Sequence, residues 1–278
     1  MTTSIRAGIP RIMEATDWIQ QALWHGCPWD DIGRPGGVAG VKFEDNFENF
    51  PTALVATSNI TQKYRTWVDT GGTIVQSLTD PLGGAVMTLD TTSNDAASIQ
   101  TGNLFNFIDP ATGTQPFDVW FDAQFEIGTL TDSFFVGAMV YQAPATAALI
   151  TDGDVLGGTG DVGFVGFGAV QAAPTLLTLT YKKNGQTVQV PIASLATMVA
   201  GTKIAVGFHY KGINPTARRI SAYKNNVLQA TGVTKTAIEA AAFPDAVPMA
   251  LTAAIKNFTT TVGASMVLYR WRMAMAKW

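Results

Sequence analysis

Apolar and polar residues alternate along most of the chain from residue 43 onward, and the stretch 117–127 is the clearest case. Successive side chains of a β-strand point to opposite faces of its sheet, so this alternation predicts a strand with one face in a core. The apolar face holds Phe117, Val119, Phe121, Ala123, Phe125 and Ile127, and the other face holds Asp118, Trp120, Asp122, Gln124 and Glu126.

Similar alternation recurs at short spacing, with almost no helical pattern between the strands. Parallel α/β folds need crossover helices, so the sequence excludes them. We therefore expect an all-β fold, an antiparallel β-sandwich. The further strands are predicted at residues 83–92, 96–102, 133–141, 161–170, 176–183, 203–211 and 265–278.

The stretch 218–233, RRISAYKNNVLQATGV, places two β-prone runs on either side of Lys224-Asn225-Asn226. Asn adopts positive φ more readily than other residues with a side chain, so paired asparagines between such runs predict a tight hairpin turn. We expect this ribbon to be a wall or a contact rim of the sandwich.

The main helical pattern covers residues 10–25, and the stretch that follows, GCPWDDIGRPGGVAG, predicts an extended connector. Residues 236–244 are expected to form one helical turn or two before Pro244. We therefore divide the chain into an N-terminal arm with one helix, residues 1–42, and a sandwich domain, residues 43–278. The arm could cap its own sandwich or reach a neighbouring subunit. Its three tryptophans favour the neighbour, since they exceed what one helical stripe can hide and aromatic anchors concentrate binding energy.

Charged residues make up only 14% of the chain, against about 25% in typical soluble domains, so we expect a partner to cover part of the surface. The net charge is −3 without a basic block, which argues against nucleic acid as a partner. Cys27 is the only cysteine, which excludes an internal disulfide framework. The sequence shows neither a membrane span of ~20 apolar residues nor the apolar core of a signal peptide.

Several of these stretches also resemble a known family. The phrase YKNNVL is similar to the signature of concanavalin A-like, laminin-G-type jelly rolls. The order of segments, from FEDNFENF (43–50) through residues 83–102 to the closing aromatic strand, resembles that of virion structural proteins of tailed bacteriophages. The resemblance covers about residues 43–278 and implies a jelly roll, with residues 43–50 as its first strand and residues 83–102 as a hairpin.

This resemblance implies a non-enzymatic virion protein, of the capsid decoration (cement) type, assembled in the host cytoplasm. The expected partners are the major capsid protein or other virion proteins, and further copies of the chain, a trimer being one option. No cofactor, nucleic acid or membrane is expected. The alternative function is a carbohydrate-binding module or a glucanase-like protein on the same fold.

Sandwich-fold glucanases of the laminarinase type carry Glu-x-Asp-x-(x)-Glu on a strand such as 117–127, where this chain has Asp122-x-Gln124-x-Glu126. Strand residues four positions apart are separated by ~13 Å. The paired carboxyls of glycosidases lie ~5–9.5 Å apart. Asp122 therefore cannot act together with either Glu126 or Asp118 on this strand, and no catalytic residue is predicted.

Trp120 lies on the same predicted face, where it could stack on a sugar ring or anchor a protein interface. The low charge around it favours the interface. The candidate interface residues are therefore Trp18, Trp24, Trp29 and Trp120.

Two further clusters are weak candidates, and no metal site is predicted from them. Asp152, Asp154 and Asp161 offer oxygen ligands for Ca²⁺, but the stretch lacks the Glu that ends an EF-hand loop, and Asp-Gly-Asp is common in turns. His25 and Cys27 form a close pair of base and nucleophile, without an adjacent carboxylate to orient the imidazole. One His and one Cys are too few ligands for a metal ion.

The first and last strands of the sandwich, residues 43–50 and 266–275, are expected to pair as neighbours. An unpaired apolar strand at a sheet edge would promote aggregation.

Overall fold

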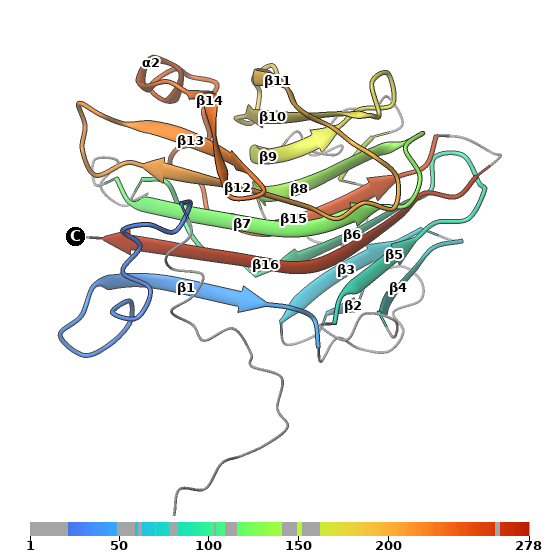
Figure 1. The fold of residues 1–278 in the computed structure, drawn as a ribbon, viewed down its shortest axis with the longest axis horizontal. Helices are drawn as coiled ribbons and strands as arrows, with labels where there is room; N and C mark the ends of the chain where they lie inside the picture. Colours follow the sequence, from blue (N-terminus) through green and yellow to red (C-terminus); the bar gives the residue numbers. More distant parts are fainter. Residues whose placement is uncertain are drawn as a thin grey trace, which may run out of the picture.

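The computed structural model describes residues 22–48, 59–60, 63–69, 71–77, 83–102, 104–108, 116–140, 149–151, 162–258 and 262–277. Within them, two antiparallel sheets of eight strands each face one another (Figure 1). The prediction of an antiparallel β-sandwich is confirmed. In this part of the chain α2 (Lys235–Ile238) is the one helix, and no helix there has the length and apolar character that a membrane crossing requires.

The first sheet, called sheet A, is organised around its longest strand, β16 (Ser265–Lys277). One side of β16 pairs with β7 (Asp118–Ile127). The other side pairs with β1 (Ala39–Asp45) near the end of the chain and with β5 (Ala85–Thr88) at the opposite end of the strand. The sheet continues beyond β7 with β12 (Ile204–Lys211), β13 (Arg219–Lys224) and β14 (Val227–Val233), and beyond β5 with β4 (Thr73–Gln76).

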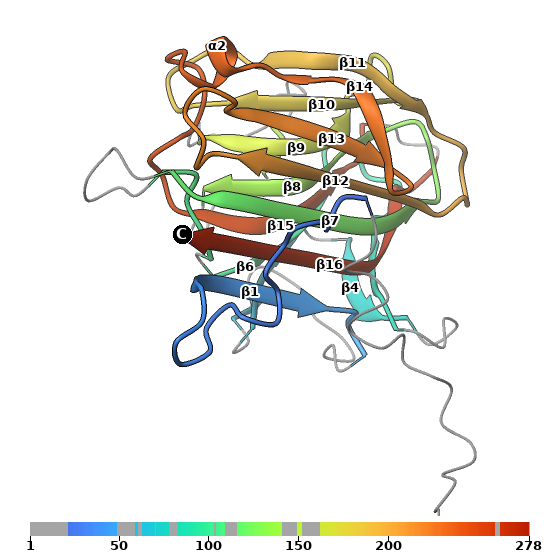
Figure 2. The ribbon, with the colours of Figure 1, turned by 60° about the vertical axis from the view of Figure 1, so that its left-hand side comes forward.

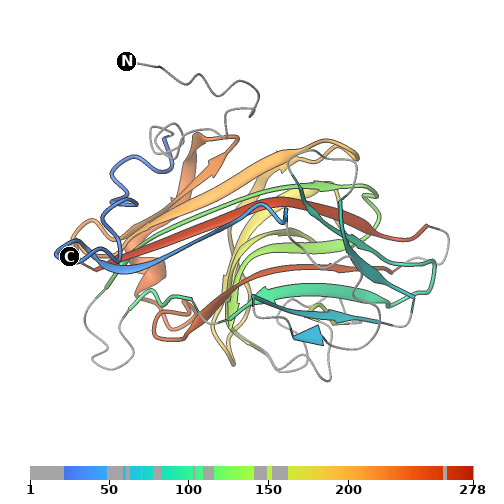
Figure 3. The same ribbon diagram turned by 90° about the horizontal axis from the view of Figure 1, so that it is seen from below.

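The second sheet, called sheet B, covers the inner face of sheet A, and Figure 3 shows the two layers from the side. Near its middle lies β15 (Met249–Lys256), all eight residues of which are buried. Its strand order is β11 (Gln189–Thr197), β10 (Leu176–Lys182), β9 (Phe164–Ala169), β8 (Ser133–Val140), β15, β6 (Ala96–Thr101), β3 (Tyr64–Val68) and β2 (Asn59–Ile60).

The main core fills the space between the sheets and is rich in phenylalanine. Phe125 of sheet A contacts Phe134 of sheet B at a ring-centroid distance of 5.7 Å, and Phe121 lies 5.2 Å from Phe208 on the neighbouring strand. The inward face predicted for 117–127 is confirmed, because all its apolar residues belong to this core: Phe117, Val119, Phe121, Ala123, Phe125 and Ile127.

The hairpin predicted at 218–233 is formed by β13 and β14, joined by Asn225 and Asn226. Both asparagines have positive φ, 47° and 64°, as the two central residues of a type I′ turn require. Asn225 also fixes the turn to β12: its N–H donates to the carbonyl of Ala205 at 2.7 Å, and its side-chain oxygen accepts from the N–H of Ala205 at 3.0 Å.

The pairing of the first and last strands is confirmed, with Phe43 opposite Met273. β1 nevertheless begins four residues earlier than residue 43, because its pairing continues to Ala39 opposite Lys277, so the boundary placed at residue 42 falls inside a strand.

The expected hairpin at 83–102 is wrong, because its two strands belong to different sheets. β5 pairs with β4 and β16 in sheet A, whereas β6 pairs with β15 and β3 in sheet B. The helix predicted over 10–25 lies mostly outside the described residues, and residues 22–26 form turns.

Candidate functional site

Residues 22–38, called the strap, lie across the outer face of sheet A, the face turned away from the main core (Figures 2 and 3). The backbone of the strap folds on itself in turns. The N–H of Cys27 donates to the carbonyl of Trp24 at 2.9 Å, and that of Gly33 donates to the carbonyl of Val38 at 3.1 Å. The strap therefore attaches to the sheet through side chains and not as an additional strand.

The apolar side chains of the strap form a second buried cluster with the outer face of sheet A, separate from the main core. The rings of Trp24 and Trp29 meet edge to face, with centroids 5.4 Å apart. The small side chains of Ala274 and Ala276 on β16 leave room for these indoles. The members of the strap cluster are Leu23, Trp24, Cys27, Trp29, Ile32, Trp120, Tyr223, Ala274 and Ala276.

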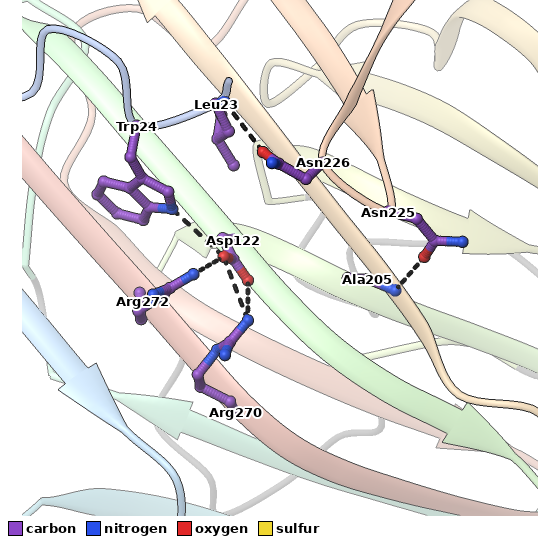
Figure 4. A network of polar contacts seen from close by, with 8 residues as sticks. All are labelled: Leu23, Trp24, Asp122, Ala205, Asn225, Asn226, Arg270 and Arg272. Atoms are coloured by element: carbon purple, nitrogen blue, oxygen red, sulfur yellow. Dashed lines mark hydrogen bonds and ion pairs between the residues drawn. The ribbon is translucent and has the colours of Figure 1, made fainter. Parts of the chain in front are cut away.

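A charged network lies next to this cluster, centred on Asp122 of β7 (Figure 4). The indole N–H of Trp24 donates to Asp122 at 3.3 Å, and the guanidinium groups of Arg270 and Arg272 both pair with the carboxylate. Arg272 stands opposite Asp122 in the strand register, and its guanidinium lies 5.1 Å from the centre of the Trp24 ring.

The network holds Asp122 in its ionised form. Burial alone would raise the pKa of its carboxyl group, but the charges of Arg272 and Arg270 hold that pKa below the usual value. A buried carboxylate paired in this way has a structural role and is not available as a general acid.

The hairpin turn also holds the strap. The side-chain oxygen of Asn226 accepts a hydrogen bond from the backbone N–H of Leu23 at 3.2 Å (Figure 4). Asn225 bonds to β12 and Asn226 to the strap, so each asparagine of the turn fixes a different neighbour.

Trp120, a member of the strap cluster, forms a stacked pair with His209, with ring centroids 4.6 Å apart and planes at 18°. They face each other across β7 and β12. Among the described residues, neither Trp120 Nε1 nor His209 Nε2 has a hydrogen-bond partner, although both atoms are buried. Burial lowers the pKa of His209 to about 3, so the imidazole is neutral at physiological pH.

The structure brings three of the four candidate interface tryptophans together and buries them against their own sandwich. The exposed fractions of Trp24, Trp29 and Trp120 are 0%, 7% and 1%. Trp18 lies outside the described residues. The three indoles are thus not free anchors in this structure, because Trp24 and Trp29 of the strap pack together with Trp120 of sheet A within the chain.

The polar face predicted for 117–127 is only partly solvated, since Trp120 and Asp122 are buried, and its carboxylates make separate contacts. Asp118 accepts hydrogen bonds from the backbone N–H groups of Gly212 at 2.8 Å and Ile213 at 3.2 Å. Glu126 accepts one from the hydroxyl of Tyr269 at 2.9 Å. These carboxylates therefore fix loops and strands of the sandwich.

The pair His25 and Cys27 does not form a dyad. His25 is exposed, whereas Cys27 is buried with its pKa raised to about 12 by desolvation. The aspartates at positions 152, 154 and 161, considered above as oxygen ligands for Ca²⁺, lie outside the described residues. In the described ranges, no group of three or more His, Cys, Asp or Glu side chains is arranged to hold a metal ion.

Sequence reasoning missed His209, Arg270 and Arg272 as members of this site. The alternation in 203–211 and 265–278 was the available signal, since it places these residues on the polar face of their strands. Their meeting with Asp122 depends on the register of three strands distant in sequence.

No family model matches the chain, and a comparison with curated proteins found no sequence match. Solved structures match in fold. A protein of unknown function from Shewanella oneidensis MR-1 aligns over 97% of this chain and 97% of its own, with a TM-score of 0.51 and 9% identity. The carbohydrate recognition domain of Emp47p covers 80% of this chain and 93% of its own, with a TM-score of 0.49 and 10% identity. Peanut lectin covers 86% and 98%, with a TM-score of 0.46 and 13% identity.

At these identities the similarity concerns the fold alone. The alignment with the Shewanella protein extends over nearly the whole of both chains. The described part of the chain is, in its fold, an antiparallel β-sandwich of two eight-stranded sheets.

Proposed function

We propose that this chain is a non-enzymatic structural protein of a tailed-bacteriophage virion, of the capsid decoration type. The proposal that the protein is not an enzyme is based on the outer face of sheet A, which the strap covers. Where a sandwich-fold glucanase would present its carboxylates, Asp122 is paired with Arg270 and Arg272 and lies beneath Trp24. Such a sandwich would bind other proteins through its surface and would not catalyse a reaction.

The proposed attachment surface is the edge strand β14. Val227 and Leu228 are 63% and 56% exposed, and the whole strand contains neither a charged residue nor proline. Edge strands commonly carry charged residues or proline, which prevent pairing with other chains. The edge strand of sheet B that contacts β14, β11, follows this rule with Pro191. An uncharged, apolar edge is therefore suited to a permanent protein partner.

A protein of this kind would act by burying area across the joints between shell subunits. Binding to the assembled state alone stabilises that state by mass action, and standard interfaces bury about 1,200–2,000 Å² in total. The low charge of the chain agrees with such a covered surface.

Purified particles provide the test. Mass spectrometry is expected to find this chain in them, and Leu228→Asp is expected to reduce binding of the chain to the shell by at least about tenfold. Val199→Asp is the matched control, because Val199 is 61% exposed but lies outside β14. Particles without the chain, or equal loss of binding by the two variants, would contradict the proposal.

The carbohydrate-binding alternative requires a free aromatic surface. Trp120, the residue best placed to stack on a sugar, is buried in the cluster that it forms with the strap. A glycan array and a β-glucan hydrolysis assay with the full chain separate the two functions, and clear binding or turnover would favour the alternative.

A further inference from the structure

We infer that the outer face of sheet A is a recognition surface for a tryptophan-bearing segment, which the strap occupies in its own chain and which the strap of a second copy can occupy instead. The inference deepens the proposed function, because it names where the arm of a sister copy would attach. It is argued from the contacts of the strap alone.

The strap can separate from the sandwich without breaking a sheet. Its turns are closed by its own backbone hydrogen bonds, and its buried side chains belong to a cluster distinct from the main core. Gly33 and Gly36, both with φ of 76°, lie between its buried residues and β1. These glycines adopt positive φ without strain and can also leave it, which makes this stretch a suitable hinge.

The face holds Leu23 and Trp24 of the strap through three groups with different chemistry. The carboxylate of Asp122 accepts from the indole N–H of Trp24, and the guanidinium of Arg272 lies over the indole ring. Asn226 accepts from the backbone N–H of the preceding Leu23. All three groups stand on strands or on a tight turn, so they keep their positions when the strap leaves (Figure 4).

Removal of the strap leaves no buried charge unpaired on the face, because Lys42, which donates to the carbonyl of Trp29 at 3.0 Å, is exposed to water. Asp122 retains both arginines, whereas a lone buried carboxylate would be strongly unfavourable. Trp120 Nε1 and His209 Nε2, buried without a partner beneath the strap, gain access to water. The face is therefore built to persist in an open state. The strap of a second copy has the same sequence and offers the same contacts.

The chain contains its own reporter of this opening. Cys27 is the only cysteine, is 6% exposed and belongs to the strap cluster. A thiol reagent reaches it when the strap lifts, so the labelling rate measures the open fraction. A molecule that binds the open face raises that fraction by the factor 1 + [L]/Kd.

The experiment uses the full chain and a synthetic peptide of residues 22–33 carrying Cys27→Ser. The peptide is expected to increase the labelling rate of Cys27 in proportion to its concentration, by at least about tenfold at ten times its Kd. The control peptide, which also carries Trp24→Ala, is expected to have no effect. A rate independent of the first peptide, or an equal increase with both, would overturn the inference.

A second variant tests the recognition groups in the full chain without any peptide. Trp24→Phe keeps an aromatic ring but removes the N–H that Asp122 accepts, so labelling of Cys27 is expected to accelerate roughly tenfold. If Cys27 instead reacts at the rate of global unfolding in both chains, the strap is not separable and the inference is wrong. Because these measurements use the purified chain, they can fail while the particle experiment succeeds, and the reverse.

Discussion

The main core and the strap cluster bury aromatic side chains equally well but hold them in different ways. Phe125 lies in a strand hydrogen-bonded on both sides and faces a second sheet. Trp24, just as completely buried, lies in irregular turns held to the sheet by side chains. Burial of a residue therefore does not tell how much of the fold depends on it. The hydrogen bonds between its backbone and neighbouring strands are a better guide.

The largest effect is expected in the main core. Phe125→Ala removes a fully buried ring between the sheets and is expected to reduce the free energy of unfolding by about 3–5 kcal/mol, measured by urea denaturation. Phe125→Leu is the control, with an expected loss below about 1.5 kcal/mol because most of the volume is kept. Equal losses for the two would show that the core tolerates a cavity there.

The next effect concerns the charged network that joins the two regions. Asp122→Asn leaves the buried guanidinium of Arg272 without a carboxylate and is expected to cost about 3 kcal/mol. Asp118→Asn lies on the same strand face but keeps an oxygen for the N–H groups of Gly212 and Ile213, so we expect about 1 kcal/mol. Similar losses for both variants would mean that the arginine pairing contributes little.

A smaller effect is expected from a substitution in the strap, although Trp24 is a larger side chain than Phe125 or Asp122. Trp24→Ala cannot destabilise the sandwich by more than the strap contributes, so the expected loss is below about 2 kcal/mol. Labelling of Cys27 is expected to reach the rate of an unstructured peptide while the sandwich still melts cooperatively. A loss as large as that of Phe125→Ala would place the strap and the core in one cooperative unit.

The smallest expected effect is a difference in pH dependence between the stability of the sandwich and the opening of the strap. Burial and a hydrogen bond with Asp90 raise the pKa of Asp95, next to β6, to about 6. The folded chain thus holds this proton more tightly than the unfolded chain. Protonated Asp95 therefore makes its full contribution to the free energy of unfolding below about pH 4, and this contribution disappears as the pH rises through about 6.

The measurement compares melting temperatures across that range with those of Asp95→Asn, in which this pH dependence is expected to be absent. The strap should not respond between about pH 5 and 8, because the pKa of Asp122 is lowered and that of His209 is about 3. Once corrected for thiol ionisation, a change in Cys27 protection over this range would contradict that assignment.

The sequence predicted the elements whose signal is local. Alternation placed Phe121 and Phe125 inside and Trp120 and Asp122 outside, and paired asparagines located the hairpin turn. It missed β15, because MALTAAIK is buried on both faces and does not alternate, and β11, which contains Pro191.

Local sequence patterns could not predict that the strap covers the outer face of sheet A. The strap has no periodic pattern, and its contact between Trp24 and Asp122 spans 98 residues. The pairing of Asp122 with Arg272 spans 150 residues and depends on register, which one sequence does not fix.

The position of β16 has a consequence for how the chain is made. β7 must wait for a partner that follows it by about 150 residues, and β1 and β5 wait for the same strand. At about 5–20 residues per second, ribosomal synthesis leaves β7 without β16 for roughly 8–30 s, and β1 and β5 for longer. Sheet A therefore closes late, after translation of residue 277, and contacts so distant in sequence are slow to form. During synthesis its apolar strands are expected to depend on chaperones for protection from aggregation.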